Sequence, residues 1–176
     1  MRVKSGTDSR RGQSLVEVAL MMPVLIMLLL GMVEVVNIGR TYLALLDTSY
    51  QGAHLGSQGL SRYDNTKIYT LVEQDLTNKG YNTSALNNII TTRAKISGGV
   101  IDHSTYATDK RKGGGRSTVL TETLLNSRLR GGDPAGRLIV VEIVYDYTLL
   151  FPWPNLAGIF PNPFPLVAYT IQYVAR

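Results

Sequence analysis

The chain contains no cysteine and only two histidines, His54 and His103, among its 176 residues. Without cysteine there is no disulfide framework, no thiolate zinc site and no cysteine nucleophile. Two histidines are too few for most histidine-based metal and acid–base sites, and no recognised catalytic or nucleotide-binding motif surrounds either one. We therefore expect a protein that is not an enzyme and that holds no cofactor and no metal.

Charge is also scarce, and it is unevenly placed. Charged residues make up 18% of the chain, whereas an average soluble domain has roughly 25%. The formal net charge is +5, and residues 1–12, with four basic residues and one acidic residue, supply +3 of it. This concentration at the N-terminus favours membrane targeting over nucleic-acid binding. We expect neither a nucleic-acid partner nor a small-molecule substrate.

A long apolar run follows the basic N-terminus. The 16 residues between Glu17 and Glu34 carry no charge. As a helix, the wider segment 15–38 is about 36 Å long, and a bilayer has a hydrocarbon core of about 30 Å. Membrane helices tolerate both Pro23, where a helix kink is expected, and Gly31. The run predicts a single membrane span; the alternative is a helix buried in a soluble core.

The charges that flank this run predict how it is inserted. Basic residues precede it, and only Arg40 follows it within about twenty residues, so the positive-inside rule places the N-terminus in the cytoplasm. The C-terminal part then lies outside the cytoplasmic (inner) membrane, in the periplasm or at the cell surface. A secretory signal peptide is an alternative, but its apolar region is typically about 7–15 residues and is followed by an A-x-A-like site, which is missing here.

A different processing signal matches the residues around Gly12. A basic pair, Arg10-Arg11, precedes Gly12, and Gln13 and Glu17 follow it before the apolar helix. This order resembles the class III signal of type IV pilin-like proteins. The resemblance implies that a prepilin peptidase cuts after Gly12, so that Gln13 becomes the first residue and Glu17 the fifth. A carboxylate there is attracted to the helix dipole and to the new terminal ammonium group, which lowers the cost of burying both charges when helices pack.

The similarity extends over about fifty residues, to the N-terminal region of the TadE-like proteins. These are pseudopilins of the tight-adherence (Flp-type) pilus system. The matching positions are Gly12, Val16-Glu17, Ala19, Pro23, Leu28–Gly31, Val33-Glu34 and Ser49–Gly56. The chain departs from the family at Val18, where an aromatic residue is common, and at its end, Arg176. The resemblance implies a minor pseudopilin that adheres to other pilin-like subunits and to the pilus assembly platform, with Glu17 and Glu34 as assembly residues.

The patterning along the whole chain predicts three parts. These are a basic leader over 1–12, a long helix over 13–59 and an extracytoplasmic domain over 60–176. In the domain we expect helices over 65–79 and 118–130 and strands over 89–97, 100–106, 137–150 and 166–174. The expected fold is α+β and pilin-like: the long helix continues beyond the membrane and packs on a small antiparallel sheet of three or four strands.

The composition of two further segments does not by itself decide their structure or role. Residues 109–117 form a basic glycine-rich stretch, most simply a solvated loop. Residues 151–165 combine prolines, which exclude a regular helix or central strand, with four large aromatic residues, Phe151, Trp153, Phe160 and Phe164. This segment can fold back on the core, lie at the membrane interface or dock a partner. The alternative function is therefore an uncleaved, single-span membrane anchor whose outer domain binds a ligand.

Overall fold

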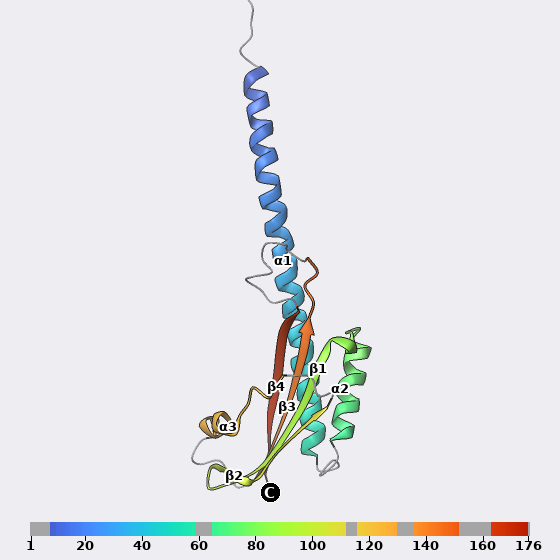
Figure 1. The fold of residues 1–176 in the computed structure, drawn as a ribbon, viewed down its shortest axis with the longest axis vertical. Helices are drawn as coiled ribbons and strands as arrows, with labels where there is room; N and C mark the ends of the chain where they lie inside the picture. The colour runs from blue at the N-terminus through green and yellow to red at the C-terminus, as the bar shows by residue number, and fades with distance from the viewer. Residues whose placement is uncertain (1–7, 59–64, 112–115, 130–135, 152–162, 176) are drawn as a thin grey trace, which may run out of the picture.

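The computed structural model describes residues 8–58, 65–111, 116–129, 136–151 and 163–175. The elements in chain order are α1 (Asp8–Ser57), α2 (Thr66–Asn78), the 3-10 turn η1 (Thr83–Ala85), β1 (Leu86–Ser97), β2 (Val100–Arg111), α3 (Glu122–Arg128), β3 (Gly136–Tyr147) and β4 (Phe164–Ala175). The N-terminal half of α1 projects from a small domain that the other elements build around its C-terminal half (Figure 1). The predicted α+β fold with a long N-terminal helix is confirmed.

The four strands form one antiparallel sheet in the order β2-β1-β3-β4. The two strands of the first hairpin meet at Gly98-Gly99, as the sequence predicts. Both glycines have positive φ, 64° and 78°, the backbone that a tight hairpin turn requires. Strands β3 and β4 pair along their whole length, from Gly136 opposite Ala175 to Tyr147 opposite Phe164.

The alternation of β3 sends its side chains into two separate cores. Ile139, Val141, Ile143, Tyr145 and Tyr147 face α1 and α2 and join the larger buried cluster there. Leu138 and Val140 face the other way and pack with Leu120 and Leu125 from the segment that contains α3. Both faces of β3 are thus buried, and its sequence is accordingly apolar on both faces.

A buried carboxylate organises the second face of the sheet. The Glu142 side chain is 1% exposed and accepts hydrogen bonds from the backbone N–H groups of Val119, at 3.0 Å, and Leu120, at 3.2 Å, and from the hydroxyl of Thr118. These donors compensate for the removal of the charge from water. They hold the chain before α3 against the sheet, so that Leu120 is buried.

Small residues let the second half of α1 approach the sheet and α2 closely. A Cβ added at Gly52 would lie 3.3 Å from the side chain of Ile68, and one added at Gly56 would overlap the side chain of Ile139. The Ser49 hydroxyl lies 2.7 Å from that of Thr170 on β4. The small residues Ser49, Gly52 and Gly56 therefore lie on the face of the long helix that packs on its own domain.

Two local predictions differ from the structure. Helix α3 is shorter than the predicted 118–130, and the buried Leu120 precedes the helix instead of lying on it. Residues 109–111, expected in a loop, are the end of β2. Arg111 there is held by two hydrogen bonds to Glu73 of α2, at 3.0 and 3.1 Å. The rest of the predicted loop, 112–115, lies outside the described residues.

Candidate functional site

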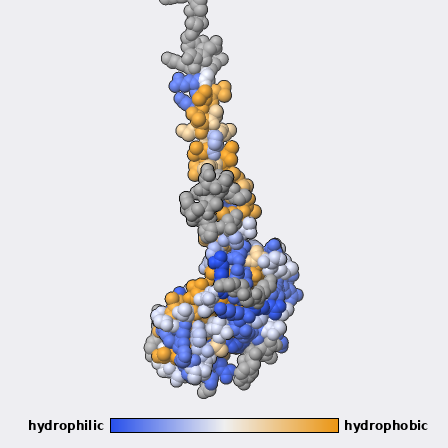
Figure 2. Space-filling view, viewed as in Figure 1, coloured by the Kyte–Doolittle hydropathy of each residue, from blue (hydrophilic) through white to orange (hydrophobic). Residues whose placement is uncertain are grey.

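The most unusual surface of the protein is the projecting part of α1. Its large apolar side chains from Leu15 to Val33 are exposed, apart from the half-buried Leu30. Figure 2 shows this helix as a mostly hydrophobic rod above a domain whose visible surface is largely polar. Each such side chain gains about 1.5–3 kcal/mol when it leaves water. A surface of this kind marks contact with lipid or with other proteins.

The dimensions of the projecting part fit a bilayer. From Leu15 to Val33 the helix is about 28 Å long, close to the roughly 30 Å of a hydrocarbon core. Among the described residues, this is the one helix with the length and composition to cross a membrane, and its most apolar stretch has no buried residue. α1 continues without a break through Pro23. These properties make α1 a candidate membrane anchor.

Gly12, Gln13 and Glu17 lie together near the start of α1, and all three are exposed. A Cβ added at Gly12 would meet no atom within 4 Å, so packing within the subunit does not require glycine there. Glu17 makes no hydrogen bond or ion pair with any described residue. It lies four residues after Gln13, which is about 6 Å along the helix. The carboxylate is therefore available to a positive group at or near residue 13.

Glu34 has a different environment, although it resembles Glu17 in sequence. Its side chain is 6% exposed, and both carboxylate oxygens accept the backbone N–H of Leu150, at 3.2 Å each. The buried hydroxyl of Tyr147 lies beside the Glu34 carboxylate but forms no well-aligned hydrogen bond. Burial, and then the neighbouring Glu34 carboxyl, raise the pKa of Tyr147 to about 12. Glu34 therefore connects α1 to the end of β3 within one subunit.

A second polar cluster attaches α1 to α2 further from the membrane. The Lys79 ammonium group lies 2.6 Å from both Asp47 of α1 and Asp75 of α2. The Thr48 hydroxyl donates to Asp75 at 2.5 Å. The hydrogen bond from the Lys79 ammonium group lowers the pKa of Asp47. The hydrogen bonds to the two aspartates raise the pKa of Lys79, although burial acts in the opposite direction. The cluster fixes α1 as a rigid continuation of the domain.

The aromatic segment is described only at its two ends. Phe151 and Phe164 are both half-buried, and Phe164 packs beside Leu149 against the larger core. Trp153 and Phe160 lie outside the described residues. The position of Phe164 agrees with folding back on the core at that end. For the remainder of the segment the three interpretations stay open.

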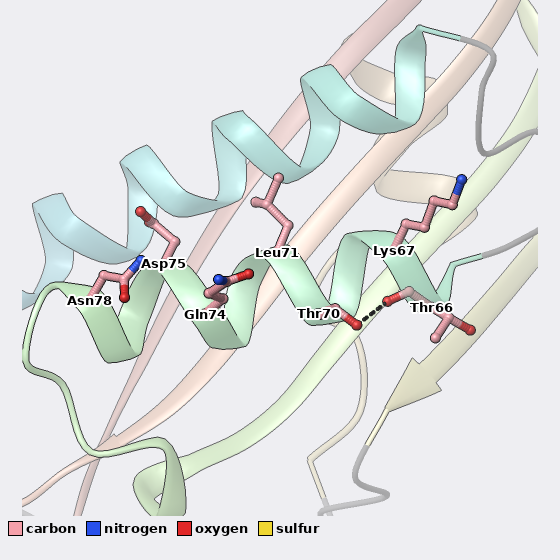
Figure 3. A pocket seen from close by; sticks show the side chains of 7 residues that line it. All are labelled: Thr66, Lys67, Thr70, Leu71, Gln74, Asp75 and Asn78. Carbon is pink, nitrogen blue, oxygen red and sulfur yellow. Dashed lines mark hydrogen bonds between the residues drawn. The ribbon is translucent and has the colours of Figure 1, made fainter.

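The surface of the domain has a hollow beside α2. The depression in Figure 3 runs along the outer side of α2 and is lined by Thr66, Lys67, Thr70, Leu71, Gln74, Asp75 and Asn78. Leu71 and Asp75 point toward α1, and the Thr70 hydroxyl donates to the carbonyl of Thr66 at 2.9 Å. In the part of the chain that the structure describes, no three metal-ligating side chains lie together.

Comparison with known protein families finds a match on the same part of the chain. Residues 12–54 match the family described as TadE-like protein. The N-terminal region is that of a TadE-like protein. The resemblance predicted from the sequence is confirmed over these residues, which include Gly12, Glu17 and Glu34. No curated protein and no solved structure matches the chain significantly.

The match also defines the broad role of the chain. TadE-like proteins are components of the tight-adherence pilus machinery and are not known as an enzyme family. The match over residues 12–54 indicates a pilus-associated protein with an N-terminal membrane helix. The TadE-like region ends within α1, so the sheet and α2 lie outside the match.

The structure gives Glu34 a role that the sequence does not predict. The partner of Glu34 is a backbone N–H 116 residues away along the chain, and no sequence pattern marks Leu150 as a donor. By contrast, the isolated position of Glu17 at the helix start follows directly from its sequence neighbours. The two glutamates thus have different surroundings in the folded subunit.

We expect Glu34→Ala to loosen the domain from α1. The substitution leaves the Leu150 N–H without its acceptor and opens space beside Tyr147, at a cost of about 1–3 kcal/mol. The melting temperature of the detergent-solubilised protein, followed by circular dichroism, should fall by about 2–4 °C per kcal/mol. Glu17→Ala is the matched control and should leave the melting temperature unchanged. Equal melting temperatures for the two variants would contradict this role of Glu34.

Proposed function

We propose that this protein is a minor pseudopilin of a tight-adherence (Flp-type IV) pilus. It enters the cytoplasmic membrane with its N-terminus inside and its domain outside. A prepilin peptidase removes the basic leader after Gly12, and the apolar helix then packs with other pilin-like subunits or with the assembly platform. The observation that carries the proposal is the projecting apolar stretch from Leu15 to Val33, whose single charge, Glu17, has no hydrogen-bond or ion-pair partner among the described residues.

The position of that charge supports assembly through the helix. A lone carboxylate near the hydrocarbon boundary is costly unless it is paired. Trimming after Gly12 places a new ammonium group about one helical turn from Glu17. Within a filament, the carboxylate can pair with this group on its own or on a neighbouring subunit, which fixes the register between helices. Glu17 is thus the carboxylate available for charge pairing in the assembly, whereas Glu34 bonds within its own subunit.

Because the domain is rigidly attached to α1, packing of the helix also orients the domain. The second half of α1 is held to the rest of the domain at Glu34, Ser49, Gly52 and Gly56. Any rotation of the helix therefore rotates the domain as well. Packing of the membrane part then decides how the domain is presented outside. This arrangement fits a protein that primes, caps or decorates a filament. The chain needs a separate ATPase for assembly, since its sequence contains no nucleotide-binding motif.

The decisive experiment is intact-mass and N-terminal analysis of the protein isolated from membranes with and without an active prepilin peptidase. The proposal expects a chain that begins at Gln13 only where the peptidase is active. A full-length chain in both strains would instead identify a permanent anchor. The ligand of the outer domain would then become the functional question.

A further inference from the structure

The segment that follows β3 places an exposed leucine at the membrane end of the domain. It leaves the sheet after Tyr147 and rises along α1 toward the projecting part of the helix (Figure 1). The hydrogen bonds from the Leu150 N–H to both oxygens of Glu34, at 3.2 Å each, fix its height on α1. The Leu150 side chain is 57% exposed. It therefore lies level with Glu34, the residue that directly follows the exposed apolar stretch from Leu15 to Val33.

The bond between Glu34 and Leu150 suits a position at the hydrocarbon boundary. Non-helical backbone near lipid is costly where its N–H groups have no acceptor. Here the Leu150 N–H has the Glu34 carboxylate as its acceptor. A single exposed leucine is common on a protein surface, but Leu150 is not isolated, because the exposed Val33 and Val35 lie on either side of Glu34 at the same height. The apolar surface of the helix therefore continues onto the domain.

Arg40 adds an independent observation just outside this boundary. It is exposed, and its guanidinium group makes no hydrogen bond or ion pair with any described residue. Its Cα lies about 9 Å beyond Glu34 along the helix, and the headgroup region of each leaflet is roughly 5–8 Å thick. Side chains on a helix lean toward its N-terminus, which here is the direction of the membrane. The long side chain therefore reaches the level of the lipid phosphates, which a guanidinium binds through paired N–H donors.

We propose that Leu150 and Arg40 form a lipid-contact surface on the domain, with Leu150 in the apolar boundary of the facing leaflet and Arg40 on the phosphates of anionic lipids. Lipid is the occupant because this surface is continuous with the membrane span and lies at the depth of the leaflet. The inference rests on the membrane insertion in the proposed function, but not on trimming or on entry into a pilus. Arg40 lies about a third of a turn from Glu34 around α1, so the two contacts hold the domain on different sides of the helix.

Spin labelling tests the lipid contact of Leu150, because the chain has no native cysteine. The full-length variant Leu150→Cys, which keeps the backbone bond to Glu34, carries a nitroxide and is reconstituted in vesicles of phosphatidylcholine and phosphatidylglycerol. Its matched control is Val100→Cys at the opposite end of the sheet, where Val100 is 54% exposed. The frequency of collisions with oxygen, which concentrates in bilayers, relative to collisions with a water-soluble nickel complex should be several-fold higher at position 150 than at position 100.

Any other result at position 150 overturns the lipid contact. Frequent nickel collisions would place the residue in water, and rare collisions with both reagents would show that protein covers it. Val24→Cys, within the apolar stretch and 55% exposed in the subunit, reports membrane insertion separately. Oxygen access at position 24 without oxygen access at position 150 removes this inference alone. Nickel access at position 24 removes the insertion on which the proposed function also depends.

Tryptophan quenching in the same vesicles tests the role of Arg40. Val36 lies one turn nearer the membrane on the same face of α1, so Val36→Trp reports on the lipids beside Arg40 once Trp153→Phe has removed the single native tryptophan. One basic residue at an anionic surface corresponds to about fivefold in local lipid concentration. The ratio of quenching by brominated phosphatidylglycerol to quenching by brominated phosphatidylcholine should therefore fall several-fold in Arg40→Gln. Arg137→Gln, which removes an exposed charge at the far end of the sheet, should leave the ratio unchanged. An equal ratio with and without Arg40 would overturn its phosphate contact.

Discussion

Glu17→Ala should abolish assembly of the protein into pilus-associated complexes while leaving the subunit folded and inserted. In the trimmed protein the substitution leaves the terminal ammonium group near the hydrocarbon without its carboxylate. Removal of one partner of a buried ion pair costs about 3–5 kcal/mol, which corresponds to a loss of roughly a hundredfold or more in association, at 1.4 kcal/mol per factor of ten. The measurement is the amount of variant in the sheared pilus and cross-linked complex fractions, relative to its amount in membranes.

Two further substitutions separate the charge of Glu17 from its size. Glu17→Gln keeps the shape and should be almost as defective, because the amide carries no charge to pair. Glu17→Asp keeps the charge on a shorter side chain and should recover part of the assembly. Since Glu17 is exposed and makes no hydrogen bond or ion pair with any described residue, all three variants should melt at the temperature of the wild-type protein. Normal assembly of Glu17→Ala would favour the uncleaved anchor with a ligand-binding domain.

The elements of the fold could be predicted where a periodic pattern is long. The alternation in 137–147 predicts the strand, whereas the division of its side chains between two cores is a finding of the structure. The long helix follows from its uncharged run and from the small residues after it. These patterns reflect backbone geometry, which depends on neighbouring residues alone. The same holds for the hairpin at Gly98-Gly99, where the turn itself selects the residue type.

Predictions failed where long-range partners decide the structure. Asp109 and Arg111 belong to an apparent basic loop in sequence, but they extend β2 because Asn65 and Glu73 from α2 and its start bind them. Asn65 matches a helix cap, yet its side chain bonds Asp109 and Arg93 and makes no cap bond to the helix. Leu120 lies outside α3 because its backbone N–H donates a hydrogen bond to the buried Glu142 carboxylate. Each of these contacts joins residues more than twenty positions apart.

The candidate site shows the same division between local and long-range information. Gly12 and Glu17 are recognisable because a short linear signal is, by its nature, contained in consecutive residues. Glu34 matches the same family pattern, but its burial against Leu150 depends on the fold of the whole domain. The pattern alone therefore groups the two glutamates together. The fold separates them into one carboxylate available to a neighbour and one used by its own subunit.

Gly12→Trp should block removal of the leader without blocking membrane insertion. The indole occupies a position where the peptidase is expected to bind a residue without a side chain, and overpacking of this kind costs about 1–3 kcal/mol, or about 5- to 160-fold in rate. The subunit itself has room for the larger residue, because a Cβ at Gly12 meets nothing within 4 Å. The intact mass of the membrane-bound variant, from a strain with active peptidase, should be that of the untrimmed chain.

Gly31→Trp is the matched control for this experiment. A Cβ at Gly31 also meets nothing within 4 Å, so the same substitution is made in the same helix at a second unobstructed glycine, and trimming should remain normal. Recovery of the shortened chain from Gly12→Trp would remove the class III processing assignment. If Gly12→Trp stays untrimmed and also fails to assemble, with Glu17 intact, then a carboxylate alone does not support packing. The new ammonium group at Gln13 would then be required as its partner, as pairing of the two charges demands.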